Sequence, residues 1–191
     1  MPVRSYETGD GVHCREFRQL TILDGQLERS AGTVHLVSHA ASSVLTTANR
    51  GAASVTVSAD GNWFAFDSRS SDLVTGQVDP FATNDVFLSE RATGLVRLLS
   101  HASGAPLTAV GGFSSEISAD GSAIAFVSDA VNLSSPQVDS FGTWDLFLYD
   151  RAADSCTLVS HAAGSPSTAA GASAGAVFAL SADASWIAYA S

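Results

Sequence analysis

The stretch Ser58-Ala59-Asp60-Gly61-Asn62-Trp63-Phe64-Ala65-Phe66 decides the fold of this chain. An Asp-Gly pair lies between two short apolar runs, of which Val55–Val57 is the first. Asp-Gly in this context predicts a β-hairpin with a type I′ turn, in which both central residues have positive φ.

The same motif returns twice along the 191 residues. Ser58-Ala59-Asp60-Gly61 recurs 60 residues later at Ser118 and, after a further 63, at Ser181, with Ala184 in place of the glycine. An alanine with positive φ costs about 1 kcal/mol. Other motifs repeat in the same order: Val37-Ser38-His39-Ala40 at Leu99 and Val159, Gln77-Val78-Asp79 at Gln137, and Asp85-Val86-Phe87-Leu88 at Asp145. An internal repeat of this kind indicates a repeat architecture.

Each repeat predicts four antiparallel strands. In the first copy these are Val55–Val57, Trp63–Phe66, Val86–Leu88 and Val96–Leu99, and the second copy matches them up to Cys156–Val159. Segments rich in Ser, Thr, Gly and Ala separate the strands and are typical of loops. No stretch has a helical period, so the predicted fold class is all-β.

The second strand of each repeat predicts how the sheets pack. Phe64-Ala65-Phe66 carries large apolar side chains on one face and alanine on the other, and Ile124-Ala125-Phe126 and Ile187-Ala188-Tyr189 repeat this. A sheet with one solvated face would carry polar residues there. Two dry faces favour four-stranded blades stacked face to face, as in a β-propeller.

The number of repeats predicts an incomplete β-propeller over residues 34–191. It holds a partial blade with one matching strand (Thr33–His39), full blades at 53–101 and 115–161, and a half blade at 177–191. Closed propellers need about 4–8 blades. We therefore expect a fragment, a truncated gene product or a ring completed by other chains, with self-association through open blade edges.

These motifs resemble the TolB-type β-propeller repeat family of bacterial exported proteins, over residues 33–191. The Ser-Ala-Asp-Gly hairpin and the run Asp85-Val86-Phe87-Leu88, followed by Arg91-Ala92-Thr93-Gly94, carry the resemblance. It implies a propeller that is periplasmic or extracellular and serves in binding or scaffolding, or one appended to a hydrolase.

Residues 1–33 form a separate N-terminal segment. Cys14-Arg15-Glu16-Phe17, Thr21-Ile22, Asp24-Gly25 and Gly32-Thr33 resemble the C-terminal domain of bacterial surface-antigen lipoproteins over residues 8–33, although Val34 and His35 stand where that pattern has a second cysteine. The resemblance implies a remnant of another domain. The alternative is a plain hairpin of Glu16–Ile22 and Gln26–Gly32 about Asp24-Gly25.

Composition excludes several classes of partner. Nine Arg and no Lys face 19 acidic residues, and the formal net charge is −10. Nucleic-acid binding needs clustered cations, so we expect no nucleic-acid partner. No apolar run reaches the roughly 20 residues of a membrane span, and the N-terminus has no apolar core of a signal peptide.

The acidic loops before the third strands are the candidate metal site. Asp79 and Asp85 in the first copy, and Asp139 and Asp145 in the second, could offer hard oxygen ligands to Ca²⁺, which takes 6–8 of them. Phe81 and Phe141 stand where the resembling family commonly has Asn. The alternative is an Asx turn, in which the aspartate accepts hydrogen bonds from loop backbone groups. No other cofactor is expected.

Two further patterns predict structure rather than chemistry. His39, His101 and His161 end equivalent strands, where a hydrogen bond to loop backbone is expected instead of a shared zinc ion. Ser173 lies in a Gly-x-Ser-x-Gly match, but the nucleophile elbow requires a strand followed by a helix. Cys156, which takes the place of Val96, is expected to be a small buried hydrophobe.

The sequence therefore predicts a non-catalytic binding or scaffolding module in an exported bacterial protein. The alternatives are the propeller part of a larger hydrolase and a calcium-binding repeat module. No catalytic residue is assigned.

Overall fold

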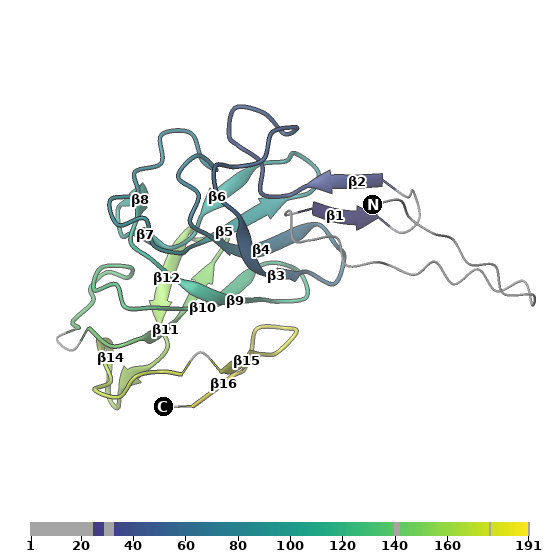
Figure 1. The fold of residues 1–191 in the computed structure, drawn as a ribbon. Helices are drawn as coiled ribbons and strands as arrows, with labels where there is room; N and C mark the ends of the chain where they lie inside the picture. Colours follow the sequence, from purple (N-terminus) through teal and green to yellow (C-terminus); the bar gives the residue numbers. More distant parts are fainter. Residues whose placement is uncertain (1–24, 29–32, 140–141, 176, 191) are drawn as a thin grey trace, which may run out of the picture.

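The computed structural model describes residues 25–28, 33–139, 142–175 and 177–190, and these form an all-β fold without a helix. Two four-stranded antiparallel sheets lie at its centre (Figure 1). In each sheet the strands pair in chain order, as expected for consecutive hairpins. The first unit contains β3 (Ala52–Val57), β4 (Trp63–Ser68), β5 (Asp85–Glu90) and β6 (Val96–Leu98). The second unit contains β9 (Phe113–Ile117), β10 (Ala123–Ser128), β11 (Asp145–Asp150) and β12 (Ser155–Leu158).

Two half-units flank these sheets. The N-terminal half-unit is the hairpin of β1 (Gly25–Glu28) and β2 (Thr33–Leu36), and the C-terminal half-unit is the hairpin of β15 (Phe178–Leu180) and β16 (Ile187–Tyr189). In Figure 1 the purple N-terminal half-unit and the yellow C-terminal half-unit lie at opposite ends of the molecule.

Two small hairpins lie in segments expected to be loops. They are formed by β7 (His101–Ala102) with β8 (Ala105–Ala109), and by β13 (His161–Ala162) with β14 (Ser165–Ala169). Val78 forms a parallel bridge to Thr108 beside the first hairpin, and Val138 bridges Thr168 beside the second. The sequence did not predict these strands, because the segments are rich in Ser, Thr, Gly and Ala. The pairing of the strands depends on contacts distant in sequence.

The packing between the two units confirms the prediction of two dry faces. Every residue of β10 is buried, as is every residue of β4 after Trp63. Ile124 and Phe126 belong to the same buried cluster as Ala65. Bulky side chains of the second unit therefore pack on the face of the first unit that carries alanine.

The outer faces of both units are also covered. Phe64, Phe66 and Phe87 of the first unit pack with Val37 and its neighbours in a second cluster. Ala125 and Val127 of the second unit pack with Phe178, Leu180 and Ile187 of the C-terminal half-unit in a third. The core is thus a series of apolar layers between sheets, as in face-to-face sheet packing.

The turn type predicted for Ser58–Gly61 is wrong. Gly61 has φ +68°, but Asp60 is not among the described residues with positive φ, and the Gly61 N–H donates to the Ser58 carbonyl at 2.9 Å. A hydrogen bond from residue i+3 to residue i, with one left-handed glycine, fits a longer hairpin loop built around a type I turn. The Asp60 carboxylate explains the difference, since it accepts hydrogen bonds from Ser58 Oγ (2.6 Å) and the Asn62 N–H (3.0 Å).

The N-terminal hairpin lies across the expected segment boundary. Gly25–Glu28 pairs with Thr33–Leu36, so the boundary at residue 33 falls inside a hairpin. A strand at Gly25–Glu28 is therefore present beside the one expected at Thr33–His39. Residues 16–22, the other half of the alternative hairpin, lie outside the described residues.

The turn of the C-terminal half-unit gives a first testable prediction. Ala184 adopts φ +57°, close to Gly61 and to Gly121 at +67°. Ala184→Gly should therefore raise the free energy of unfolding by about 0.5–1 kcal/mol, because glycine removes the left-handed strain and offsets its own greater unfolded-state entropy. The urea-unfolding midpoint measures this change. Ala182→Gly in the same turn, where φ is not positive, should lower the midpoint instead; equal shifts for both variants would contradict the prediction.

Candidate functional site

The acidic loops occupy equivalent places in the two units. Asp85 and Asp145 are the first residues of β5 and β11, and Asp79 and Asp139 precede them in the connecting segments. Asp79 acts electrostatically on Asp85, and Asp139 on Asp145. The structure therefore brings the four predicted residues together as two separate pairs. The described residues hold no group of three or more His, Cys, Asp or Glu side chains that could bind a metal ion.

Asp85 joins the start of β5 to the segment after β6 and to the segment before β9. It is fully buried, and its Oδ1 accepts hydrogen bonds from the Gly111 N–H at 2.9 Å and from Ser100 Oγ at 3.2 Å. Ser100 Oγ in turn accepts the Val86 N–H at 2.9 Å. Burial raises the pKa of Asp85 to about 7, and the negative charge of Asp79 adds to that shift. Its Oδ2 is buried and has no hydrogen-bond partner among the described residues.

Asp145 repeats this arrangement in the second unit. Ser160 Oγ donates to its Oδ1 at 2.6 Å and accepts the Leu146 N–H at 3.0 Å. Burial raises the pKa of Asp145 as well. The repeated Asp-Ser pair thus connects the start of the third strand to the end of the fourth, which is a structural task.

Asp79 forms the turn that was the alternative to a calcium site. Its Oδ1 accepts the N–H groups of Phe81 (3.3 Å) and Ala82 (2.8 Å), which is an Asx-type turn. Ala82 has φ +51° inside this loop. One carboxylate oxygen of Asp79 is therefore already committed to backbone donors.

The raised pKa of Asp85 predicts that stability falls as pH rises. The folded protein keeps the Asp85 proton up to about pH 7, whereas an unfolded aspartate loses it near its ordinary pKa of 3.8. The folded state thus binds more protons between these values, so its stabilisation is complete below pH 4 and is lost as pH rises toward 7. The free energy of unfolding should drop by about 2 kcal/mol from about pH 5.5 to about pH 7.

Urea unfolding at several pH values measures this slope. Asp85→Asn should remove most of it, while exposed Asp129→Asn should leave it unchanged. A wild-type protein whose stability rises over this pH interval would contradict the assignment of a buried, protonated Asp85.

The histidines bind backbone carbonyl groups, as expected, although the carbonyls of Ala102 and Ala162 lie in β7 and β13 and not in loops. The Nδ1 atoms of His39, His101 and His161 each donate to the carbonyl oxygen of the following alanine, at 3.0, 3.0 and 3.1 Å. His39 Nε2 also contacts the Gly94 carbonyl oxygen at 2.8 Å. The three rings therefore fix strand ends.

Ser173 and Cys156 have structural contacts. Ser173 Oγ accepts the Trp144 N–H at 3.2 Å in a loop before β15, where the described chain has no helix. Cys156 packs partly buried against the core between the two units, and burial, with Asp154, raises its pKa to about 12. Cys14 lies outside the described residues.

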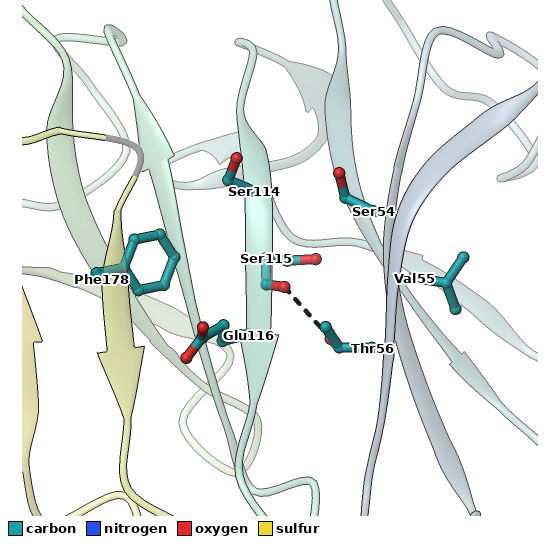
Figure 2. Close-up of a pocket in the computed structure, with 7 residues that line it drawn as sticks. All are labelled: Ser54, Val55, Thr56, Ser114, Ser115, Glu116 and Phe178. Atoms are coloured by element: carbon teal, nitrogen blue, oxygen red, sulfur yellow. Dashed lines mark hydrogen bonds between the residues drawn. The ribbon is translucent and has the colours of Figure 1, made fainter.

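A cavity that sequence analysis did not predict lies between the first strands of successive units. It has a volume of about 220 Å³ and is lined by residues of β3, β9 and β15 (Figure 2). In Figure 2, Ser114 and Ser115 stand between Ser54 on one side and Phe178 on the other, with Glu116 beside Phe178. The lining residues are Ser54, Val55, Thr56, Ser114, Ser115, Glu116 and Phe178.

The cavity wall contains a repeated backbone irregularity. Ser54 and Ser114 have φ +50° and +55°, and the strand register shifts at this point in both units. Non-glycine residues with such φ values cost about 1–3 kcal/mol and gather at functional sites. Ser115 Oγ is buried and has no hydrogen-bond partner among the described residues.

Asp67 of β4 lies against the same wall. It is 3% exposed, and burial raises its pKa to about 6, partly offset by a hydrogen bond from the Ser54 side chain. The second unit has Val127 at the equivalent position. A carboxylate in an otherwise apolar buried strand is the signal in the sequence that could have identified this site.

Comparison with known proteins gives no relative: no protein-family model matches the sequence, and no curated protein matches it.

Proposed function

We propose that this protein is a non-catalytic binding module of the β-propeller type that serves an exported bacterial protein. The observation that carries the proposal is that each four-stranded unit packs both of its faces, in one repeating order, against its neighbours. The first strands of three successive units, β3, β9 and β15, line one cavity, and positions of this kind on a rigid scaffold commonly bind partners.

The cavity between β3, β9 and β15 is the binding site of this proposal. Its walls offer hydroxyl groups, the Glu116 carboxylate and the ring of Phe178. Glu116 Oε2 accepts the Leu180 N–H at 2.7 Å, so the carboxylate is held in place. A volume of about 220 Å³ is smaller than a typical drug-sized pocket. The ligand is therefore a short polar segment of a partner protein, which inserts one side chain bearing hydrogen-bond donors.

Peptide-array binding of the purified protein tests this proposal. We expect a set of peptides with a Lys, Arg or Asn side chain to bind wild-type protein. Glu116→Gln should weaken that binding about tenfold while keeping the hydrogen bond to Leu180. Glu90→Gln is the matched control, because Glu90 is only half-buried and does not line the cavity, and it should bind as wild type does.

Two results would overturn the proposal. One is a set of peptides that binds wild type and Glu116→Gln equally, or no peptide binding at all. The other is ester hydrolysis by the purified chain that Ser173→Ala abolishes, because that result would make it an enzyme.

A calcium-binding module is the second candidate, favoured by one observation. Asp85 and Asp145 each keep a buried Oδ2 without a hydrogen-bond partner in the described part of the chain, beside a second aspartate. Ca²⁺ would supply the missing partner and neutralise the pair. Millimolar Ca²⁺ should then raise Tm in wild type, and Asp79→Ala and Asp139→Ala should cancel the rise. An unchanged Tm in wild type would exclude this candidate.

A further inference from the structure

The C-terminal half-unit is the first half of a four-stranded unit. Ser181-Ala182-Asp183 repeats the turn at Ser58, and the pairing of Leu180 with Ile187 repeats that of Val57 with Phe64. β15 and β16 therefore correspond to the first and second strands of the complete units.

The N-terminal half-unit is the second half of such a unit. Glu28 and Arg29, with Gly32 after them, correspond to Glu90, Arg91 and Gly94. The run Val37-Ser38-His39-Ala40 follows β2 as its repeat at Leu99 follows β6. β1 and β2 therefore correspond to the third and fourth strands.

Within the described part of the chain, each half-unit contains only the two strands that its counterpart does not contain. β4 and β10 pair on both sides, with β5 and β11 as their third-strand partners, whereas β16 pairs only with β15 and β1 only with β2 among the described residues. The two half-units lie at opposite ends of the molecule (Figure 1), so β16 and β1 of one chain do not meet. An open edge of this kind is a template for a strand of another chain.

The complete units give the register for that pairing. Trp63 pairs with Glu90, and Ala65 with Leu88. Transferred to the half-units, Trp186 comes opposite Glu28, and Ala188 opposite Gln26. The strands are antiparallel in both complete units, and this direction carries over.

An aromatic contact between the complete units points to the same arrangement. Trp63 lies under the Arg151 guanidinium, 4.0 Å from its ring centroid, and directly against Gly121, where a Cβ atom would come within 2.5 Å of the ring. Trp186 holds the position of Trp63 in the C-terminal half-unit but is 78% exposed.

The receiving site for Trp186 is present at the other end of the chain. Gly61 and Arg91 correspond to Gly121 and Arg151. Gly61 has open space where a Cβ atom would stand, and Arg91 is exposed. The Arg91 N–H donates to the Asn62 carbonyl at 2.8 Å, so Arg91 starts next to the Gly61 turn, and an exposed guanidinium offers a cation–π partner to an aromatic ring.

Backbone hydrogen bonds connect the turns of successive units, and the two outermost groups of this series have no such bond within the described residues. The Ala59 N–H donates to the Ala119 carbonyl, and the Ala119 N–H donates to the Ala182 carbonyl, both at 2.8 Å. Within the described residues the Ala182 N–H has no backbone acceptor and the Ala59 carbonyl no backbone donor. One further hydrogen bond of the same kind would run from the Ala182 N–H of one chain to the Ala59 carbonyl of another.

We propose that two copies of this chain associate through these ends. β16 of each copy pairs with β1 of the other and completes a four-stranded sheet, and Trp186 packs on Gly61 and Arg91 of the copy that supplied β1. Strand pairing, aromatic contact and the hydrogen bonds between turns thus all select the same partner. The four complete units of the pair (two from each copy) and the two shared units give a two-fold ring of six units, within the range of closed propellers. The ring size rests on the proposed function; the strand pairing does not.

Sedimentation velocity from about 1 µM to about 100 µM tests the association. Wild type should form dimers, and both Trp186→Ala and Gly61→Ala should weaken dimerisation about 30-fold or more, the size expected for a buried aromatic anchor. Gly104→Ala is the matched control for Gly61→Ala, because Gly104 has a similar positive φ (+76°) and open space at its Cβ. It should dimerise as wild type does. Circular dichroism checks that every variant is folded.

A mixing experiment separates a direct contact from a general loss of structure. A dimer of one Trp186→Ala chain and one Gly61→Ala chain carries both substitutions in the same contact and leaves the other contact intact. The mixture should therefore dimerise more tightly than either variant alone. Three results would overturn the proposal: a monomer at every concentration, open-ended growth beyond two chains, or variants that dimerise like wild type. Peptide binding by a monomer would leave the proposed function standing.

Discussion

Phe126→Ala should lower the free energy of unfolding by about 3–5 kcal/mol, the usual cost of emptying a buried phenylalanine site. Phe126 is fully buried and stacks with Phe147 at a centroid distance of 6.1 Å. It also belongs to the cluster that joins the two units, where Ala65 lies on the facing sheet. Small domains have a free energy of unfolding of only about 5–15 kcal/mol, so a large part of it depends on the packing of this layer.

Urea unfolding at fixed protein concentration measures the loss. Phe81→Ala is the matched control, because the same side chain is removed at a site that is 69% exposed. It should change the free energy of unfolding by less than about 0.5 kcal/mol. Similar losses for the two variants would contradict the packing of the two sheets through the Phe126 layer.

Gly121→Ala should have the second largest effect, a loss of about 2–4 kcal/mol. The backbone at Gly121 has φ +67°, which costs alanine about 1 kcal/mol. The added Cβ would also stand 2.8 Å from the Trp63 Cβ, an atom that cannot swing away without moving β4. Overpacking of this kind costs about 1–3 kcal/mol more.

Gly164→Ala separates the two contributions. Gly164 has φ +77° but nothing within 4 Å of its Cβ position. Gly164→Ala should therefore lower the free energy of unfolding only by the cost of positive φ for alanine, about 1 kcal/mol. The difference between the two urea midpoints reports the contact between Trp63 and the second unit. Equal midpoints would mean that this contact does not form.

Much of the fold could be predicted from local patterns. The alternation of Phe64-Ala65-Phe66 located a strand with two buried faces, and Gly61 located its turn, because both signals lie within a few residues. The type predicted for that turn was wrong because the Asp60 carboxylate accepts hydrogen bonds from Ser58 and Asn62. The hairpins β7–β8 and β13–β14 were missed, since their sequences carry no apolar alternation.

The candidate site was predictable only in part. The Asx turn at Asp79 follows from one residue and its own loop backbone. The raised pKa of Asp85 does not, because it needs burial under Gly111, which is 26 residues away in sequence. The cavity beside Asp67 depends on three strands from three repeats, so no local pattern contains it.

The sequence by itself determined the repeating unit, its strands and the alternation of bulky and small side chains, because strand periodicity and turn chemistry act over neighbouring residues. Only the tertiary structure decided which sheet faces pack together, which carboxylates are buried away from water, and that the described residues at each end of the chain pair into a two-stranded half-unit. Those properties arise from burial and pairing between segments far apart in the chain, and their free energy exists only once the sheets are stacked.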